Sequence, residues 1–485
     1  MRQDMTISLL RMVMMLKLGS LFDGSGGFPL AGMLEGIKPV WASEIEPFPI
    51  RVTTKRLPQV KHYGDVSRMD GSQLEPVDII TFGSPCQDLS LAGKRHGLEG
   101  SRSGLFYEAV RIIREMRRAT DGRYPRWCIW ENVPGAFSSN KGEDFRCVIE
   151  TLCKIADESV YVPRPEKWDS AGAVMGDSYT LAWRQLDAQY WGVAQRRKRV
   201  FIVTNFAEGG GRAPEVLFDS DCLHGNSEEM QSQGQETARE IGESTDTAVS
   251  VYENHSQDCR YRELDGVSNT LASNLGTGGN NQPLVVDEST AYRICSQGSN
   301  AMNSANPLSG IYETSVAPTV DTSDQSPNKS QGGICIYTSN KASHFTATDK
   351  NIAQTLVATD YKEPQIVFPD CSQIVRRLTP TECARLQGFP DWWCSDLGTP
   401  ESEITESDIA FWRGVFETHR AIVTNAEKGK TDKQIIKWLT NPHSDAAEYK
   451  MWGNGVALPC VRFIMRNIRL AEELENKERG EHETK

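Results

Sequence analysis

The chain has 485 residues, a formal net charge of −12 at pH 7, and 12 cysteines without a single C-x-x-C pair. Its length predicts roughly two or three domains with a sizeable core. The scattered cysteines argue against a disulfide framework or a zinc site and indicate reduced thiols, so we expect a cytoplasmic protein of a bacterial host. The acidic net charge disfavours a surface covered in basic residues for nucleic-acid binding, but it does not exclude a local basic groove.

The first residues, which include LLRMVMMLKLGSLF, are apolar but are interrupted by Arg11 and Lys17 and lack a small-residue cleavage site. No stretch of the sequence approaches the length of a membrane span. We therefore expect neither a membrane anchor nor a signal peptide, and no membrane partner.

Short β-rich runs alternate with segments of helical period between residues 17 and 205. We predict strands at 17–22, 39–45, 60–66, 77–84, 126–133, 179–186 and 199–205, and helices between them that include 105–118 and 145–155. This alternation indicates βαβ units. It predicts an α/β, Rossmann-like fold with a mixed, mostly parallel sheet and helices on both faces.

The composition changes after residue 205, because residues 207–373 are rich in Gly, Ser, Thr, Asn and Gln and lose the helical period. We predict a separate β- and loop-rich domain there, with 207–247 as a linker. The expected division is an α/β part at 17–205, the inserted domain at 206–375, a motif segment at 376–399, a helical insertion at 400–448 and a closing part at 449–475.

A Gly-rich turn, FDGSGGF, follows the first predicted strand. Its glycines allow a tight turn and a close approach to a ligand, although many such turns are no more than turns. No Lys-Ser/Thr pair follows, which excludes a phosphate-cradling loop. The next two predicted strands end in acids, Glu44 and Asp65, which could bond ribose hydroxyls and an adenine amino group. The set favours an adenosine ligand without a pyrophosphate, S-adenosylmethionine rather than NAD.

Cys86 lies in GSPCQDLS, directly after another predicted strand. Reacting groups collect at the carboxyl ends of strands in open α/β sheets, although a cysteine is more often simply a small buried hydrophobe. Glu131 ends a further strand in WENV, and Arg197 and Arg199 alternate into the last strand, so their side chains point to one face. Taken alone, Glu131 could be an ordinary solvated carboxylate, and the two arginines part of a solvated basic run. A cysteine, a carboxyl and two arginines at neighbouring strand ends together form a specific set.

Together these residues resemble the DNA cytosine-5 methyltransferase family, in its bacterial and bacteriophage form. The motifs LFDGSGG, SEI, GDV, GSPCQ, ENV, QRRKR, RRLTPTECARLQGFP and GNGVALP stand in the family's order and cover about 18–203, 377–390 and 453–459. Ser20 and Asp23 stand where the family often has an acid and a small residue, and Gly455 stands where Ser or Ala is common.

The resemblance implies methyl transfer from S-adenosylmethionine to C5 of a cytosine flipped out of double-stranded DNA. It assigns Cys86 as the nucleophile at C6, Glu131 as the donor at N3, Arg199 as the contact to O2 and Arg197 as the support of Glu131. The polar segment after Cys86 would close over the base.

The resemblance also implies that the two ends of the chain build one catalytic domain, with a target-recognition domain inserted between them. The expected cofactor-binding residues are Phe22, Asp23, Gly24, Gly26, Gly27, Glu44, Ile45, Asp65, Val66, Pro85, Leu105, Asn454 and Gly455. We expect a monomer of the kind found in restriction-modification or in prophages, with no metal.

Three other functions remain open from the sequence. A tRNA cytosine-5 methyltransferase would share the apparatus, although the long polar domain favours duplex DNA. A thymidylate-synthase-like enzyme also uses a Pro-Cys nucleophile but would not need the adenosine-site pattern. A DNA-binding protein with a dead site is disfavoured because Cys86, Glu131 and Arg199 are all present.

Residues 250–370 contain three similar stretches, each with a Thr followed by an aliphatic residue: Thr270, Thr319 and Thr355. Their spacing is unequal, which excludes a strict solenoid. The stretches are either reused hairpins or stacked recognition units that read more than one DNA sequence in the major groove.

Overall fold

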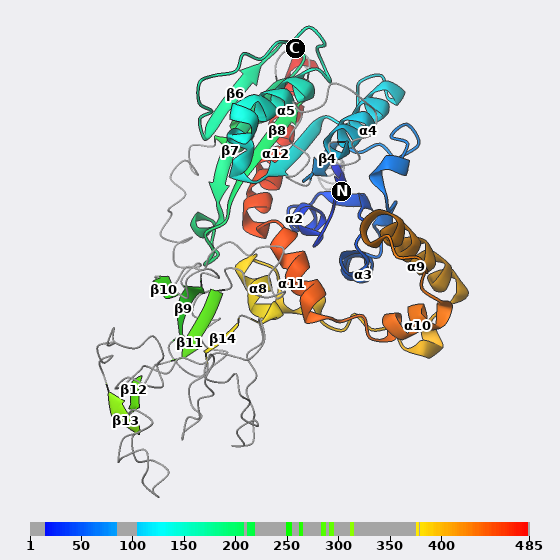
Figure 1. The fold of residues 1–485 in the computed structure, drawn as a ribbon. Helices are drawn as coiled ribbons and strands as arrows, with labels where there is room; N and C mark the ends of the chain where they lie inside the picture. The colour runs from blue at the N-terminus through cyan, green and yellow to red at the C-terminus, as the bar shows by residue number, and fades with distance from the viewer. Residues whose placement is uncertain are drawn as a thin grey trace, which may run out of the picture.

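The computed structural model describes residues 15–84, 104–207, 211–218, 249–254, 261–264, 283–287, 291–294, 311–314, 375–377 and 379–483. A sheet of eight strands forms the centre of the described chain, in the order β3-β2-β1-β4-β5-β8-β7-β6 (Figure 1). The strands are β1 (Lys17–Leu21), β2 (Lys38–Ser43), β3 (Lys61–His62), β4 (Ile79–Phe82), β5 (Trp127–Asn132), β6 (Ala171–Met175), β7 (Thr180–Asp187) and β8 (Lys198–Asn205).

Strands β3, β2, β1, β4 and β5 pair in parallel, whereas β8, β7 and β6 continue the sheet by antiparallel pairing. The predicted α/β fold with a mixed, mostly parallel sheet is confirmed. Strand β6 was not predicted from the sequence. Its sequence, AGAVM, is non-polar, but alanine and glycine are depleted in strands, and the residues alternate between exposed and half-buried at the edge of the sheet.

Helices cover both faces of this sheet (Figure 1). The helices are α2 (Gly27–Leu34), α3 (Pro47–Arg56), α4 (Leu105–Ala119), α5 (Glu143–Cys153), α6 (Ala213–Leu217), α8 (Pro380–Leu386), α9 (Glu406–His419), α10 (Asp432–Thr440), α11 (Asp445–Asn454) and α12 (Leu458–Glu483). Short 3-10 turns lie at Val66–Arg68, Pro134–Phe137, Ser139–Gly142, Ala188–Tyr190, Asp391–Cys394 and Glu401–Glu403, and a π turn at Arg420–Thr424. Among the described residues no helix is both long and apolar enough to cross a membrane.

Alternate residues of each strand enter different cores. In β5, Trp127 and Ile129 join the core that contains α2, α11 and α12, whereas Cys128 and Trp130 join the core that contains α4 and α5. Successive side chains of a strand point to opposite faces, so one strand with apolar residues at every position needs a helical layer on each side. This is the physical reason for the three-layer arrangement.

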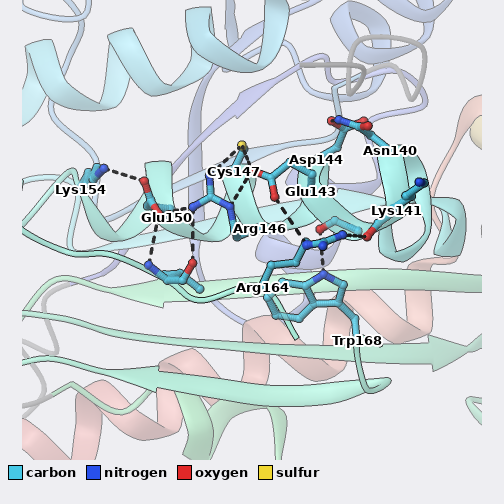
Figure 2. Close-up of polar contacts among 12 residues, drawn as sticks. Asn140, Lys141, Glu143, Asp144, Arg146, Cys147, Glu150, Lys154, Arg164 and Trp168 are labelled. Atoms are coloured by element: carbon cyan, nitrogen blue, oxygen red, sulfur yellow. Dashed lines mark hydrogen bonds and ion pairs between the residues drawn. The ribbon is translucent and has the colours of Figure 1, made fainter. Parts of the chain in front are cut away.

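The turn after β5 is held by side chains from the segment that precedes β6 (Figure 2). Asn140 and Lys141 have φ of 47° and 57°, in the left-handed region that non-glycine residues rarely adopt. Arg164 donates to the Lys141 carbonyl at 2.8 Å, and the Trp168 indole donates to the Gly142 carbonyl at 2.8 Å. These bonds fix the path by which the chain leaves β5 and enters α5.

Two further groups of strands lie in the inserted region, β9 (Val249–Asn254), β10 (Tyr261–Leu264), β11 (Pro283–Asp287) and β14 (Val375–Arg377) in one antiparallel sheet, and β12 (Ala291–Ile294) with β13 (Ile311–Thr314) as a pair. Thr270, Thr319 and Thr355 of the three similar stretches lie outside the described residues. The recognition-unit interpretation therefore stays a prediction.

The C-terminal helix α12 packs on the same core as α2, near the opposite end of the chain (Figure 1). The Trp127 indole in β5 donates to Glu472 Oε1 at 2.6 Å. Arg126 pairs with Glu472 and, at 2.7 Å, with Glu475. The Glu472 side chain is 4% exposed, so these partners are what makes a buried carboxylate tolerable.

We predict that Glu472→Ala lowers the free energy of unfolding by about 3 kcal/mol, because the change leaves Trp127 without its acceptor and Arg126 without its buried partner. Chemical denaturation followed by tryptophan fluorescence measures the effect. Arg469→Ala, which removes the more exposed pair with Glu473 on the same helix, is the control and should cost less than about 1 kcal/mol. Equal losses for the two variants would contradict a buried anchor at Glu472.

Candidate active site

Glu131 and Arg199 meet on one face of the sheet. Glu131 lies opposite Phe201 in the antiparallel pairing of β5 and β8, and Arg199 is two residues before Phe201. The period of two therefore places both side chains on the face that carries Ile129 and Val203. Arg199 Nε lies 2.9 Å from Glu131 Oε1, with the side chains 14% and 12% exposed.

Glu131 is held between opposing electrostatic effects. Burial raises the pKa of its carboxyl, while the charges of Arg199 and Arg197 and the hydrogen bond from Arg199 lower it, and the net result is a raised pKa. Burial disfavours the charged form and the guanidinium favours it. The site can therefore hold the proton of Glu131 more readily than water would.

Arg197 lies just before β8 and is fully buried. Its Nη2 donates to the carbonyl of Gly453 at 3.1 Å and to the carbonyl of Gly455, and its backbone N–H donates to Asp187 Oδ1 at 3.1 Å. Burial lowers the pKa of its guanidinium. The side chain thus ties the segment that carries Arg199 to the closing segment of the chain.

The end of β4 leads toward Glu131. A Cβ on Gly83 would lie 2.9 Å from Glu131 Oε2, so a glycine lets the backbone pass close to the carboxyl. Asn132 Nδ2 donates to the Ser84 carbonyl at 3.2 Å, and the Trp130 indole contacts Ser84 Oγ at 3.4 Å. Pro85 and Cys86, which follow directly, lie outside the described residues.

Sequence reasoning singled out Glu131 but missed the role of its neighbours Trp130 and Asn132. Their side chains lie on the opposite face of β5 from Glu131 and contact Ser84, directly after the adjacent strand β4. A period-two analysis of the WEN stretch would have pointed to them, because they share one face.

The Gly-rich turn between β1 and α2 has a left-handed backbone at three positions: Phe22, Gly24 and Gly26, with φ of 56°, 53° and 79°. Such a sequence of angles turns backbone N–H groups inward. One of them, from Gly24, donates to Glu44 Oε2 at 2.8 Å. The turn after β1 and the acid after β2 are therefore a single unit.

Glu44 accepts three backbone hydrogen bonds. Its Oε1 takes the N–H groups of Ile45 at 2.8 Å and Glu46 at 2.9 Å, in addition to the bond from Gly24. Burial raises the pKa of the carboxyl, and the backbone bonds oppose the shift. A carboxylate has about four acceptor positions, so one remains for a hydroxyl donor such as that of a ribose.

Asp65 follows β3 and accepts from Ser67 twice, from its N–H at 2.9 Å and its hydroxyl at 2.8 Å. Ser43 donates to the Gly64 carbonyl at 2.7 Å, which joins the ends of β2 and β3. Two further expected cofactor residues occupy ordinary packing positions, since Val66 is buried and Leu105, the first residue of α4, is half-buried.

The segment after α11 packs on the Gly-rich turn. A Cβ on Gly27 would lie 2.5 Å from Val456, and a Cβ on Gly455 would lie 3.0 Å from Ser25 Oγ. Asn454, the last residue of α11, is exposed. The structure thus brings the expected cofactor residues of both chain ends together, and the glycines are what permits the contact.

Ser20 and Asp23, the two unusual residues of the first motif, contact each other. Ser20 Oγ donates to Asp23 Oδ1 at 2.7 Å, whereas Asp23 Oδ2 is buried and has no hydrogen-bond partner among the described residues. Burial raises the pKa of Asp23 to about 8. The two unusual residues of the first motif thus form a buried pair.

The residues at the ends of β1, β2 and β3 fit an adenosyl ligand: a carboxylate with one acceptor position left, a Gly-rich turn closed by the C-terminal segment, and a buried polar atom at Asp23 that lacks a partner. No group of three or more His, Cys, Asp or Glu side chains suited to a metal lies in the described part of the chain.

The family model described as C-5 cytosine-specific DNA methylase matches residues 16–401. The chain belongs to this family. Its members are S-adenosylmethionine-dependent methyltransferases, which agrees with the fit of the site at β1, β2 and β3.

The two relatives described next are 26% and 30% identical to the chain over the aligned residues. The chain is 26% identical over 503 residues to the "DNA N-6-adenine-methyltransferase" of Escherichia phage P1, across 95% of this chain and 63% of that protein. It is 30% identical over 206 residues to the "Type II methyltransferase M2.BsuMI" of Bacillus subtilis, across 42% of this chain and 45% of that protein. The chain thus spans less than two thirds of the length of these curated relatives.

Among solved structures, the crystal structure of the S. pombe Dnmt2 methyltransferase is 14% identical to the chain. The match covers 95% of this chain and 99% of that one, with a TM-score of 0.45.

We predict that Asp23→Asn removes one component of the pH dependence of stability. The pKa of Asp23 is 3.8 ordinarily and about 8 in the folded protein, so between these values the folded state binds the proton more tightly. Stability must then fall as the pH rises through this window, by about 1.4 kcal/mol per pH unit, and level off above pH 8.

Chemical denaturation of the wild type and of Asp23→Asn between pH 5 and 8 tests this prediction. The variant should gain stability relative to the wild type as the pH rises, because an amide does not titrate. Parallel curves for the two proteins would show that Asp23 is ionised in the folded state.

Proposed function

We propose that this protein transfers a methyl group to C5 of a cytosine in double-stranded DNA, through a transient bond between Cys86 and C6 of the base. The buried contact of 2.9 Å between Glu131 and Arg199 carries this proposal, because it sets an acid and a cation beside the backbone that leads into Cys86. Membership of the C-5 cytosine-specific DNA methylase family supports the reaction class.

Cys86 would be the nucleophile. C5 of cytosine reacts poorly with a methyl donor until the ring gains electrons, and a thiolate that adds to C6 supplies them. Chain connectivity keeps the Cα of Cys86 within roughly 7 Å of that of Ser84, which Asn132 and Trp130 hold. A free thiol has a pKa of about 8.5, so the positive charges of Arg197 and Arg199 would favour the thiolate.

Glu131 would stabilise the charge that the addition pushes into the ring. When the C6–S bond forms, negative charge develops at N3, and a carboxyl that holds its proton can donate it there. The raised pKa of Glu131 favours that form. Arg199, on the same face, would donate to O2 of the base while it orients Glu131.

The remaining steps return the enzyme to its starting state. The methyl group would come from S-adenosylmethionine, held by Glu44 at the ribose, by Asp65 at the adenine and by the turn that contains Phe22 and Asp23. After C5 gains the methyl group, a base removes the C5 proton. The electron pair then expels the Cys86 sulfur from C6, and the proton on N3 returns to Glu131, which restores the aromatic ring and the acid.

DNA is the proposed substrate and the cytoplasm the proposed compartment, with the protein acting as a monomer. The target base must leave the helix to reach the site, at a cost of a few kcal/mol. The antiparallel strands β9, β10, β11 and β14 of the inserted region support a separate surface for the duplex. A tRNA substrate remains the alternative for the same chemistry.

A second candidate reaction is methylation of adenine at N6, which the name of the phage P1 relative states for that protein. An exocyclic amine attacks a methyl donor directly, without a covalent bond between enzyme and base. The reactions therefore differ in their need for Cys86. The Glu131–Arg199 arrangement favours cytosine, because a donor at N3 is useful when a thiolate has added to the ring.

We predict that Cys86→Ser abolishes methyl transfer while leaving cofactor affinity within about twofold, because the sulfur attacks the base and does not hold the cofactor. With 5-fluorocytosine in duplex DNA, the wild type should form an adduct that survives denaturation, since fluorine blocks the final elimination. Gel electrophoresis under denaturing conditions detects it. An active enzyme that forms no such adduct would rule out the covalent mechanism.

We predict that Glu131→Gln lowers kcat by ~10²–10⁴-fold with a much smaller effect on DNA affinity. An amide can donate a hydrogen bond toward N3 but cannot transfer a proton. Single-turnover kinetics and a DNA-binding titration measure the two quantities. Glu143→Gln, a partly exposed residue of α5, is the control. Near wild-type turnover in Glu131→Gln would mean that this residue only places the base.

A further inference from the structure

Glu46 joins three segments that lie far apart in the sequence. It is the N-cap residue of α3, two residues after Glu44. Its Oε1 lies 2.8 Å from Nζ of Lys450 in α11, and its Oε2 lies 3.3 Å from Nε2 of His419, the last residue of α9. One carboxylate thus connects the turn after β2, the helical insertion and the helix that leads to the closing segment.

The backbone of the same residue holds Glu44. The N–H of Glu46 donates to Glu44 Oε1 at 2.9 Å, beside the bond from Ile45 at 2.8 Å. A shift of Glu46 would therefore move a hydrogen-bond donor of the carboxyl that is proposed to receive the ribose. This link is local and requires no other part of the protein to move.

We propose that Glu46 is a positioning residue for the cofactor site, held by His419 and Lys450 so that its backbone keeps the Glu44 carboxyl in place. The inference rests on the proposed function, since it assigns Glu44 to the cofactor. It gives the helical insertion at 400–448 a role in cofactor binding, and Glu46, His419 and Lys450 all lie outside the motifs quoted for the family.

Electrostatics supports this role. Burial opposes ionisation of Glu46, but hydrogen bonds from His419 and Lys450 outweigh it and bring the pKa to about 2. The charge of Glu46 in turn raises the pKa of Glu44. Two neighbouring carboxylates repel each other, and a cation beside one of them offsets this repulsion. Lys450 draws the Glu46 side chain toward α11 and so leaves the Glu44 carboxyl to the backbone amides.

The insertion and the motif segment before it also support α3 along its length. Trp412 and Phe416 of α9 form a small core with Ile50 of α3. Arg51 Nε donates to the Leu397 carbonyl at 2.8 Å, and Arg56 Nε donates to the Trp393 carbonyl at 2.8 Å. These contacts set the helix as a whole, whereas the Glu46 contacts set its first turn, next to Glu44.

Lys450 connects Glu46 to the other wall of the site. It lies in α11, which ends at Asn454, and the following Gly455 contacts Ser25 of the Gly-rich turn. Glu46 therefore lies between the acid from β2 and the closing segment from the C-terminal part. Loss of the pair would loosen the acid from β2 and the closing segment, which are the two walls of the proposed cofactor site.

The test compares Glu46→Gln, Lys450→Met and His419→Gln with Arg413→Met, a matched control that removes an exposed ion pair with Asp432 from the same insertion. Calorimetry measures S-adenosylmethionine and S-adenosylhomocysteine binding. Hydrogen–deuterium exchange without cofactor follows the amides of residues 44–46, 48 and 50, since Pro47 and Pro49 carry no N–H. Kinetics with DNA separates KM for the cofactor from kcat.

We expect Glu46→Gln, Lys450→Met and His419→Gln each to weaken cofactor binding by up to about tenfold, because each removes a hydrogen bond of a charged group that holds Glu46 beside Glu44. The double variant of Glu46→Gln with Lys450→Met should be little weaker than either single one, because both changes remove one interaction. Exchange at these amides should accelerate in all three single variants, kcat should stay within about twofold, and Arg413→Met should match the wild type. The reversed pair Glu46→Lys with Lys450→Glu should recover part of the affinity.

Three results would overturn the inference. A wild type that binds the cofactor, with variants that bind it equally well, would show that Glu46 does not position the site. Parallel losses of kcat, affinity and melting temperature would show a general structural role. A wild type that binds no cofactor would overturn both this inference and the proposed function, and that result is distinguishable because it appears without any substitution.

Discussion

The antiparallel pairing of β5 with β8 is the constraint on which the site depends. Strands β1, β2, β4 and β5 run in parallel and end at one edge of the sheet, and β8 begins at that edge because it runs the other way. This reversal places Arg199 next to Glu131, in a pair that is nearly buried. Any shift of register by one residue would send one of the two side chains to the opposite face.

The second half of the site comes from the end of the chain. Arg197 binds the carbonyls of Gly453 and Gly455, Val456 packs against the Gly-rich turn, and Trp127 donates to Glu472 of α12. The two ends of the chain therefore hold each other directly. The helical insertion takes part in this closure through α3.

Much of this arrangement is predictable from the sequence, because strand periodicity, glycine and buried acids have strong local signatures. Residues 127–130 of β5 and 200–203 of β8 are apolar, and Glu131 and Arg199 adjoin these runs. Strand β6, with the sequence AGAVM, was missed because alanine and glycine are depleted in strands and give a weak strand signal. The contact of Glu46 with Lys450 spans 404 residues of sequence and carries no local pattern, so only the folded chain reveals it.

The identity of the methylated atom tests the account most directly. The purified protein would be incubated with radiolabelled S-adenosylmethionine and, in parallel, with duplex DNA and tRNA, and the products digested to nucleosides and separated. The account predicts label in 5-methyldeoxycytidine from the DNA. Label in N6-methyldeoxyadenosine, or in 5-methylcytidine from tRNA alone, would contradict it.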